Sequence, residues 1–135
     1  MNNEQIAAIE KCTQAALDGT MIFPEILSML AAHGVERYHA DYSRQELSYY
    51  LVDGASHVVS VPAFKSEIGN EFQAAIVAAA VKQSQNGEHS FVDFVRKTTN
   101  AGCVGYFVQI SGGCVIYFGR HGETHVERFP AFVVV

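Results

Sequence analysis

The stretch from Gly34 to Phe64 constrains the fold of this chain most, because a second copy of it follows 68 positions later. Ten of 31 ungapped pairs are identical, whereas average composition would give roughly two by chance. The repeated residues are Gly34, Tyr38, Ser43, Tyr49, Gly54, His57, Val58, Pro62, Ala63 and Phe64. The sequence therefore predicts two copies of one structural unit.

The length of the chain limits how these copies can be arranged. The chain has 135 residues, and half of it, about 67 residues, would be only marginally stable alone. The two copies are therefore expected to share one hydrophobic core. We predict a single domain over residues 1–135, with the first repeat at 1–67 and the second at 68–135.

Each repeat is predicted to hold two helices followed by three strands. In the first repeat, Asn2 and Gln5 form a capping box, and Gly34 is placed to end the second helix. Strands are expected at 35–42, 47–52 and 55–61, because these β-rich runs are separated by turn signals.

The second repeat is expected to follow the same plan. Asn70 and Gln73 match the capping pair of the first repeat, so a helix is expected over 71–85 and is predicted to be closely enclosed. A second helix is expected after Ser90, and strands at 104–110, 114–118 and 123–129. The predicted fold class is α+β, with two tandem ααβββ repeats, pseudo-two-fold symmetry, and antiparallel meanders packed against helices.

Composition excludes several classes of function. The formal net charge is −5 and no cluster of Lys or Arg is present, so no nucleic-acid partner is predicted. The longest apolar helical run, 74–81, is too short to span a bilayer, and the N-terminal residues do not resemble a signal peptide. The three cysteines lack CxxC spacing and are expected to be reduced thiols. A cytoplasmic protein without membrane contact is the expectation.

One group of polar residues is a candidate ligand face. If both turns of the first meander hold two residues, the register places His39, Tyr50 and His57 in one row, beside Asp41. Imidazoles, a carboxylate and a phenol on one face can perform acid–base chemistry near neutral pH. The alternative is an ordinary solvated sheet face, and no nucleophile or oxyanion signal accompanies the group.

A second group is a weak candidate metal site. Residues two apart share a strand face, so His121, Glu123, His125 and Glu127 could converge on an ion. His125 has a counterpart in His57, which has no neighbouring carboxylates, and this difference favours a structural role. No cofactor is predicted.

Apolar residues form a candidate interface. The predicted outer face of the second meander carries large apolar side chains, and the C-terminal residues 131–135 include none that is polar. Such surfaces are expected to contact the other half of the chain or a second subunit, and a homo-oligomer is predicted. The candidate interface residues are Phe107, Phe118, Phe132, Val133, Val134 and Val135.

Several motifs carry a resemblance to a known family. They are the segment 32–41 (AHGVERYHAD), Tyr49-Tyr50, the segment 101–104 with Tyr106, and the run from Tyr117 to Pro130. As a set they resemble the YbcV-like family of small bacterial and phage proteins. That family is a domain of unknown function, sometimes labelled a phage envelope protein, and the resemblance implies no catalytic residues.

Two functional hypotheses follow. The leading one is a non-enzymatic cytosolic protein that associates with itself or with a protein partner, with a phage or mobile-element origin. The alternative is a small-ligand-binding protein or enzyme that uses the His/Asp/Tyr face or the groove between the repeats.

Overall fold

The computed structural model of the chain describes residues 1–129. In chain order the helices and strands are α1 (Asn3–Asp18), α2 (Phe23–Ala32), β1 (Val35–Asp41), β2 (Glu46–Leu51), β3 (Ser56–Ser60), the short 3₁₀ helix η1 (Pro62–Phe64), α3 (Ala74–Gln85), α4 (Phe91–Asn100), β4 (Cys103–Gln109), β5 (Cys114–Gly119) and β6 (Thr124–Arg128). The fold class is α+β: four α-helices and one antiparallel sheet of six strands.

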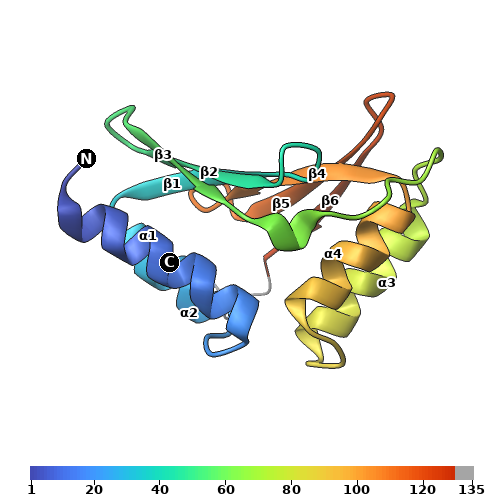
Figure 1. Cartoon of the computed structure of the whole chain (residues 1–135), viewed down its shortest axis with the longest axis horizontal. Coiled ribbons are helices and arrows are strands. Elements are labelled where there is room, and N and C mark those ends of the chain that lie inside the picture. Colours follow the sequence, from blue (N-terminus) through green and yellow to red (C-terminus); the bar gives the residue numbers. More distant parts are fainter. Residues whose placement is uncertain (130–135) are drawn as a thin grey trace.

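The six strands form a single sheet in the order β3-β2-β1-β4-β5-β6. The two meanders therefore lie side by side, and β1 pairs with β4 where they meet. All four helices lie on one face of this sheet, α1 and α2 toward one end and α3 and α4 toward the other (Figure 1).

Local sequence explains where the helices begin and end. Asn2 caps α1 in a capping box with Gln5, and Ser90 caps α4 in the same way with Asp93. Gly19 follows α1 in the left-handed conformation that favours glycine at a helix C-terminus. Pro24 lies in the first turn of α2, where its missing N–H has no cost.

The start of α3 differs from the prediction. The helix begins at Ala74, and Gln73 does not cap it with a side chain. The backbone N–H groups of Gly69 and Gln73 donate instead to the carbonyls of Thr99 and Ala101, at 2.9 and 2.8 Å. These tertiary hydrogen bonds hold residues 69–73 in a connecting segment beside the end of α4, so this segment does not join the helix.

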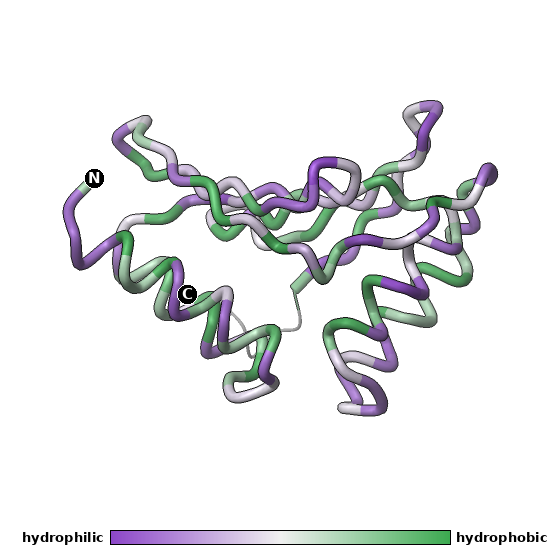
Figure 2. Tube along the Cα trace, viewed as in Figure 1, coloured by the Kyte–Doolittle hydropathy of each residue, from purple (hydrophilic) through white to green (hydrophobic). Residues whose placement is uncertain are grey.

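The core lies between the sheet and the helices. Hydrophobic and hydrophilic residues alternate along the strands (Figure 2), and the side chains that face the helices are buried. Five tyrosines dominate this layer, each no more than 6% exposed: Tyr38, Tyr42, Tyr49, Tyr106 and Tyr117. The hydroxyl of Tyr49 bonds to that of Thr13 at 2.7 Å, and the hydroxyl of Tyr42 bonds to that of Thr98 at 2.9 Å. Helix α3 is less enclosed than predicted, because only Val77, Ala80 and Val81 are buried in it.

Corresponding elements of the two halves recur at a constant spacing. The bounds of α4, β4, β5 and β6 each lie 68 positions after those of α2, β1, β2 and β3. Both central strands also carry an irregularity in register at the same place, between Val35 and Arg37 and between Cys103 and Gly105. Where β1 meets β4, His39 pairs with Phe107, the residue 68 positions later.

Candidate functional site

The sheet has one face that no described helix covers, called here the open face (Figure 1). Its side chains form three rows that run across all six strands. The first row is Ser56, Tyr50, Arg37, Gln109, Cys114 and Arg128. The middle row is Val58, Ser48, His39, Phe107, Ile116 and Val126. The third row is Ser60, Glu46, Asp41, Gly105, Phe118 and Thr124.

The half of the open face over β4, β5 and β6 is largely apolar. Phe107 and Phe118 contact each other edge to face, with ring centroids 5.9 Å apart. Ile116 lies next to Phe107 in the middle row and Val126, which is 48% exposed, continues it. The structure thus places two of the predicted interface residues, Phe107 and Phe118, together on the open face. Phe132, Val133, Val134 and Val135 lie outside the described residues.

Charges on the open face are separated by row. The first row contains the cations Arg37 and Arg128, and the third row contains the anions Asp41 and Glu46. The middle row contains no Lys, Arg, Asp or Glu. Arg37 also pairs with Glu36, and Glu46 pairs with Arg44, each at 2.7 Å. The face therefore has arginines along one edge, carboxylates along the other and no charged side chain in its centre.

Two aromatic contacts lie on the open face, one in the middle row and one in the first row. The imidazole of His39 stacks on the ring of Phe107 at 4.4 Å and 12°, and the guanidinium of Arg37 lies over the ring of Tyr50 at 4.3 Å. Burial lowers the pKa of His39, although Asp41 and Glu46 act in the opposite direction. A neutral imidazole that is packed flat against a phenyl ring is suited to a contact surface.

The predicted ligand row is wrong in its register. His39 lies opposite Ser48, and His57 lies opposite Tyr49, so His57 faces the helices and its Nε2 is 3.2 Å from Glu10 of α1. The first turn holds residues 42–45, with Gln45 at φ 55°, and the second turn is closed by a bond from Leu51 N to Ala55 O. A two-residue second turn would pair Tyr50 with His57, whereas Tyr50 pairs with Ser56. This shift of one residue moves every side chain of β3 to the opposite face of the sheet. His39, Asp41 and Tyr50 stay on the open face, while Val58 replaces His57 there.

The predicted metal ligands lie in two pairs. His121 and Glu123 share a turn, where the Glu123 carboxylate accepts the His121 N–H at 2.8 Å. His125 and Glu127 lie on the helix-facing side of β6, with Nε2 and Oε1 2.7 Å apart. Arg120, which lies in the same turn, donates to the carbonyls of Ile68 and Gly69. Within residues 1–129, no three His, Cys, Asp or Glu side chains are grouped closely enough to hold a metal ion.

The cysteines are free thiols in the described residues, and two of the three are buried. Burial raises the pKa of Cys12, and it raises the pKa of Cys103 to about 11. These two thiols are therefore protonated near neutral pH, and the thiol form is a poor nucleophile. Cys114 is half-buried in the first row of the open face.

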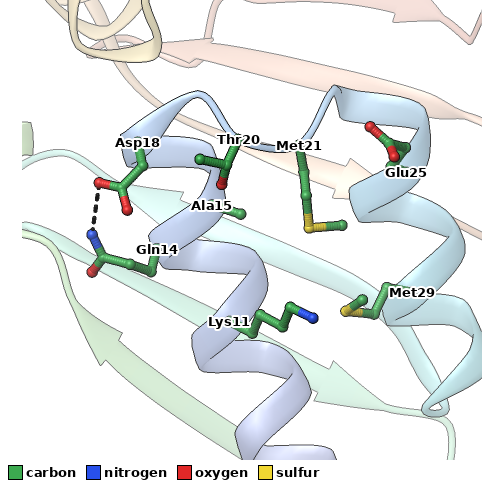
Figure 3. A pocket seen from close by; sticks show the side chains of 8 residues that line it. All are labelled: Lys11, Gln14, Ala15, Asp18, Thr20, Met21, Glu25 and Met29. Atoms are coloured by element: carbon green, nitrogen blue, oxygen red, sulfur yellow. Dashed lines mark hydrogen bonds between the residues drawn. The ribbon is translucent and has the colours of Figure 1, made fainter.

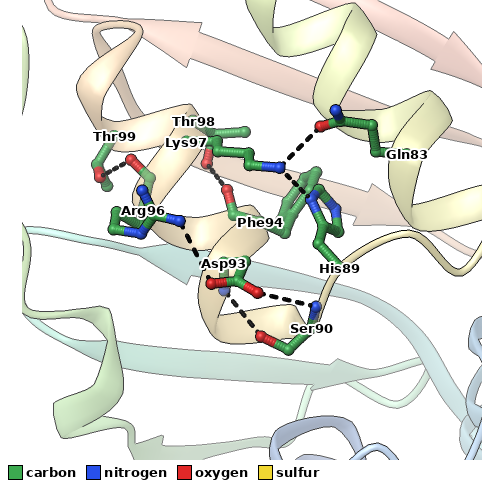
Figure 4. Close-up of polar contacts among 9 residues, drawn as sticks. All are labelled: Gln83, His89, Ser90, Asp93, Phe94, Arg96, Lys97, Thr98 and Thr99. Carbon is green, nitrogen blue, oxygen red and sulfur yellow. Dashed lines mark hydrogen bonds and ion pairs between the residues drawn. The ribbon is translucent and has the colours of Figure 1, made fainter.

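One polar cluster that was not predicted from the sequence joins α3 to α4. Lys97 donates to His89 Nδ1 at 3.0 Å and to Gln83 Oε1 at 3.1 Å (Figure 4). His89 Nε2 therefore carries the proton and donates to the Ser84 hydroxyl at 2.7 Å. Because this hydrogen bond runs from histidine to serine, His89 does not act as a base toward Ser84. The only sequence signal was the position of His89 just before the Ser90 capping box.

A shallow groove of about 650 Å³ lies between α1 and α2. The thioethers of Met21 and Met29 line it together with the charged side chains of Lys11, Asp18 and Glu25 (Figure 3). Asp18 accepts a hydrogen bond from Gln14 at 3.0 Å. Lys11, Asp18 and Glu25 are solvent-exposed, so the groove lacks the enclosed, convergent polar groups of a small-molecule site.

Comparison with known proteins gives the family of the chain. The model of a family described as "Protein of unknown function (DUF1398)" matches residues 23–127. This match covers well over half of the chain, and the chain belongs to that family. The matched segment contains three of the four α-helices, strands β1 to β5, and all of β6 except its last residue.

Curated relatives are found in mycobacteria. Uncharacterized protein Mb2035 of Mycobacterium bovis and uncharacterized protein Rv2012 of Mycobacterium tuberculosis are each 33% identical to this chain over 81 residues. The match covers 60% of this chain and 43% of each relative. This chain therefore aligns with less than half of the length of these relatives.

No helix within residues 1–129 combines the length and the apolar character needed to cross a bilayer.

Proposed function

We propose that this protein acts by self-association through the open face of its sheet. The observation that carries the proposal is the apolar half of that face, which contains Phe107, Ile116, Phe118 and Val126 and has no described helix over it. Apolar side chains grouped on one exposed surface are typical of protein interaction sites.

The polar groups of the structure support association over catalysis. The His39 imidazole is stacked on Phe107, His89 donates to Ser84, and the Cys103 thiol is buried with a raised pKa. None of these groups is arranged as an activated nucleophile with its base. The proposal therefore includes no chemical step.

We also infer that the chain is a tandem duplication with pseudo-two-fold symmetry. The constant spacing of 68 positions between corresponding elements supports this inference, as does the shared irregularity in β1 and β4. The pairing of His39 with Phe107 would place the axis at the junction of the two halves. On this view the open face became polar over one copy and apolar over the other.

The cellular setting belongs to the same proposal. Three free cysteines, two of them buried, suit a reducing compartment such as the cytoplasm. The resemblance to the YbcV-like family is the basis for proposing a phage or mobile-element origin.

One substitution and its matched control test self-association. Val126 is 48% exposed on the open face, and Val92 is 44% exposed on α4. We expect Val126→Lys to weaken a dimer by at least tenfold, measured by sedimentation over a dilution series, and Val92→Lys to leave it unchanged. The proposal would be contradicted by a wild-type chain that stays monomeric at every concentration. It would also be contradicted if Val126→Lys and Val92→Lys changed the dimer affinity by the same factor.

A further inference from the structure

The separation of charge on the open face restricts how a second copy can cover it. Arg37 and Arg128 lie in the first row, Asp41 and Glu46 lie in the third, and the row between them is uncharged. A homodimer interface usually has two-fold symmetry and brings the same patch of both chains together. Two sheets that stack face to face in the aligned class of packing keep their strands within about 30° of each other, and we consider that class.

Two directions are then available for the symmetry axis. An axis parallel to the strands reverses the strand order, so at the junction of β1 and β4 it would place Arg37 over Gln109 and Asp41 over Gly105, and neither would face an opposite charge. An axis that runs across the strands, along the middle row, would exchange the outer rows, keep each strand over its own counterpart, and place Arg37 over Asp41. Complementary potentials favour a protein contact and like charges oppose it.

We propose that two copies of this chain stack their open faces about an axis along the middle row, so that Arg37 of each copy meets Asp41 of the other. This inference rests on the proposed function, because it names the arrangement of the association proposed there. In the middle row, Phe107, Ile116 and Val126 meet their own counterparts and supply the apolar contact.

The local geometry of the two charged residues is compatible with this pair. The Arg37 guanidinium covers the ring of Tyr50 on the open face and donates to Glu36 at 2.7 Å, which leaves other N–H donors free. The Asp41 carboxylate accepts one N–H, that of Arg44, at 3.1 Å. Arg37 and Asp41 are four residues apart on one extended strand, a separation of about 13 Å, so they cannot pair within one chain.

A charge-swap cycle tests the arrangement. The proposed dimer contains two symmetry-related contacts between Arg37 and Asp41. Either single substitution, Arg37→Asp or Asp41→Arg, places two like charges at both contacts. We expect each to raise the dissociation constant at least tenfold, measured by sedimentation or light scattering over a dilution series. The double variant, with both substitutions in one chain, restores opposite charges and is expected to recover most of the wild-type affinity.

A matched control separates this pair from a general charge effect. Arg128 lies in the same row as Arg37, but the proposed axis places it over Thr124. Arg128→Asp combined with Asp41→Arg changes the net charge by the same amount as the first double variant, and it should show no recovery. Circular dichroism on each variant verifies that the fold is intact.

The outcomes distinguish the two proposals. A dimer that Val126→Lys weakens, but whose affinity shows no recovery in the Arg37→Asp/Asp41→Arg variant, overturns this arrangement and leaves association through the open face standing. Equal recovery in the Arg128 control also overturns the arrangement. A chain that is monomeric at all concentrations overturns both.

Discussion

At the scale of single residues, Gly105 shows why one position in the sheet must lack a side chain. It lies in β4 beside β1, and a Cβ atom there would collide with the backbone carbonyl oxygen of Ala40. Its counterpart 68 positions earlier is Arg37, which has room for a long side chain on the open face. The two halves therefore need different residues at corresponding places.

Gly105→Ala tests this constraint. The added methyl group must displace backbone at the junction of β1 and β4, so we expect a loss of about 3 kcal/mol in the free energy of unfolding, measured in urea. The control is Gly112→Ala, whose Cβ would lie 3.2 Å from the Cβ of Gln109, a contact that a shift of a few tenths of an ångström relieves. Equal effects of the two substitutions would show that the close approach to Ala40 has no cost.

Tyr49 and Tyr117 offer a matched test of a buried hydroxyl. The Tyr49 hydroxyl bonds to Thr13 at 2.7 Å, whereas the Tyr117 hydroxyl makes no hydrogen bond to any of residues 1–129. We expect Tyr49→Phe to cost about 1 kcal/mol of unfolding free energy and Tyr117→Phe to cost less. Thermal denaturation of both variants measures the difference, and a larger loss for Tyr117→Phe would contradict it.

At the scale of elements, the link between α3 and α4 should respond to pH. Burial and the nearby Lys97 ammonium lower the pKa of His89. The unfolded chain therefore binds the proton more tightly, and stability is full above the ordinary histidine pKa of about 6.5 and is lost as the pH falls below it. His39, whose pKa is also lowered, acts in the same direction.

His89→Gln removes this titration and should reduce the loss of stability between about pH 7 and pH 5. Urea unfolding at several pH values gives the slope for each variant. His121→Gln, which removes an exposed imidazole from a turn, is the control for the loss of one histidine elsewhere in the chain. An unchanged slope in His89→Gln would mean that the Lys97 contact does not matter to folding.

The elements also show what the sequence could and could not predict. The helices after Asn2 and Ser90 follow from their capping boxes, and all six strands lie within two residues of their expected bounds. The number of residues in each turn could not be predicted, because Asp53-Gly54 indicates that a turn is present but not how many residues it contains. One residue of difference moved His57 to the helix side and Val58 to the open face. The start of α3 was missed because tertiary hydrogen bonds to Thr99 and Ala101 decide it.

At the scale of the whole molecule, the two halves are tied together by more than the β1–β4 ladder. Tyr42 of the first half bonds to Thr98 of α4 and contacts Tyr106. Phe64 of η1 is fully buried and its ring packs against that of Phe91 at 6.0 Å. Neither half can lose its structure without exposing side chains of the other.

The chain should therefore unfold in one cooperative transition. Near-ultraviolet circular dichroism reports the buried tyrosines and far-ultraviolet circular dichroism reports the helices, so the two urea curves should coincide. Phe91→Ala should shift both curves together to lower urea. Two separate transitions would show that the halves fold independently.

The pairing of His39 with Phe107 has a consequence for how this surface can vary. Both strands at this junction belong to one polypeptide, so the two facing positions are encoded separately and can hold an imidazole and a phenyl ring. If two identical half-length chains met in the same register, every substitution would appear on both sides at once. Because one gene encodes both halves, one half of the sheet face can stay polar and solvated while the other half becomes apolar and able to bind a second protein.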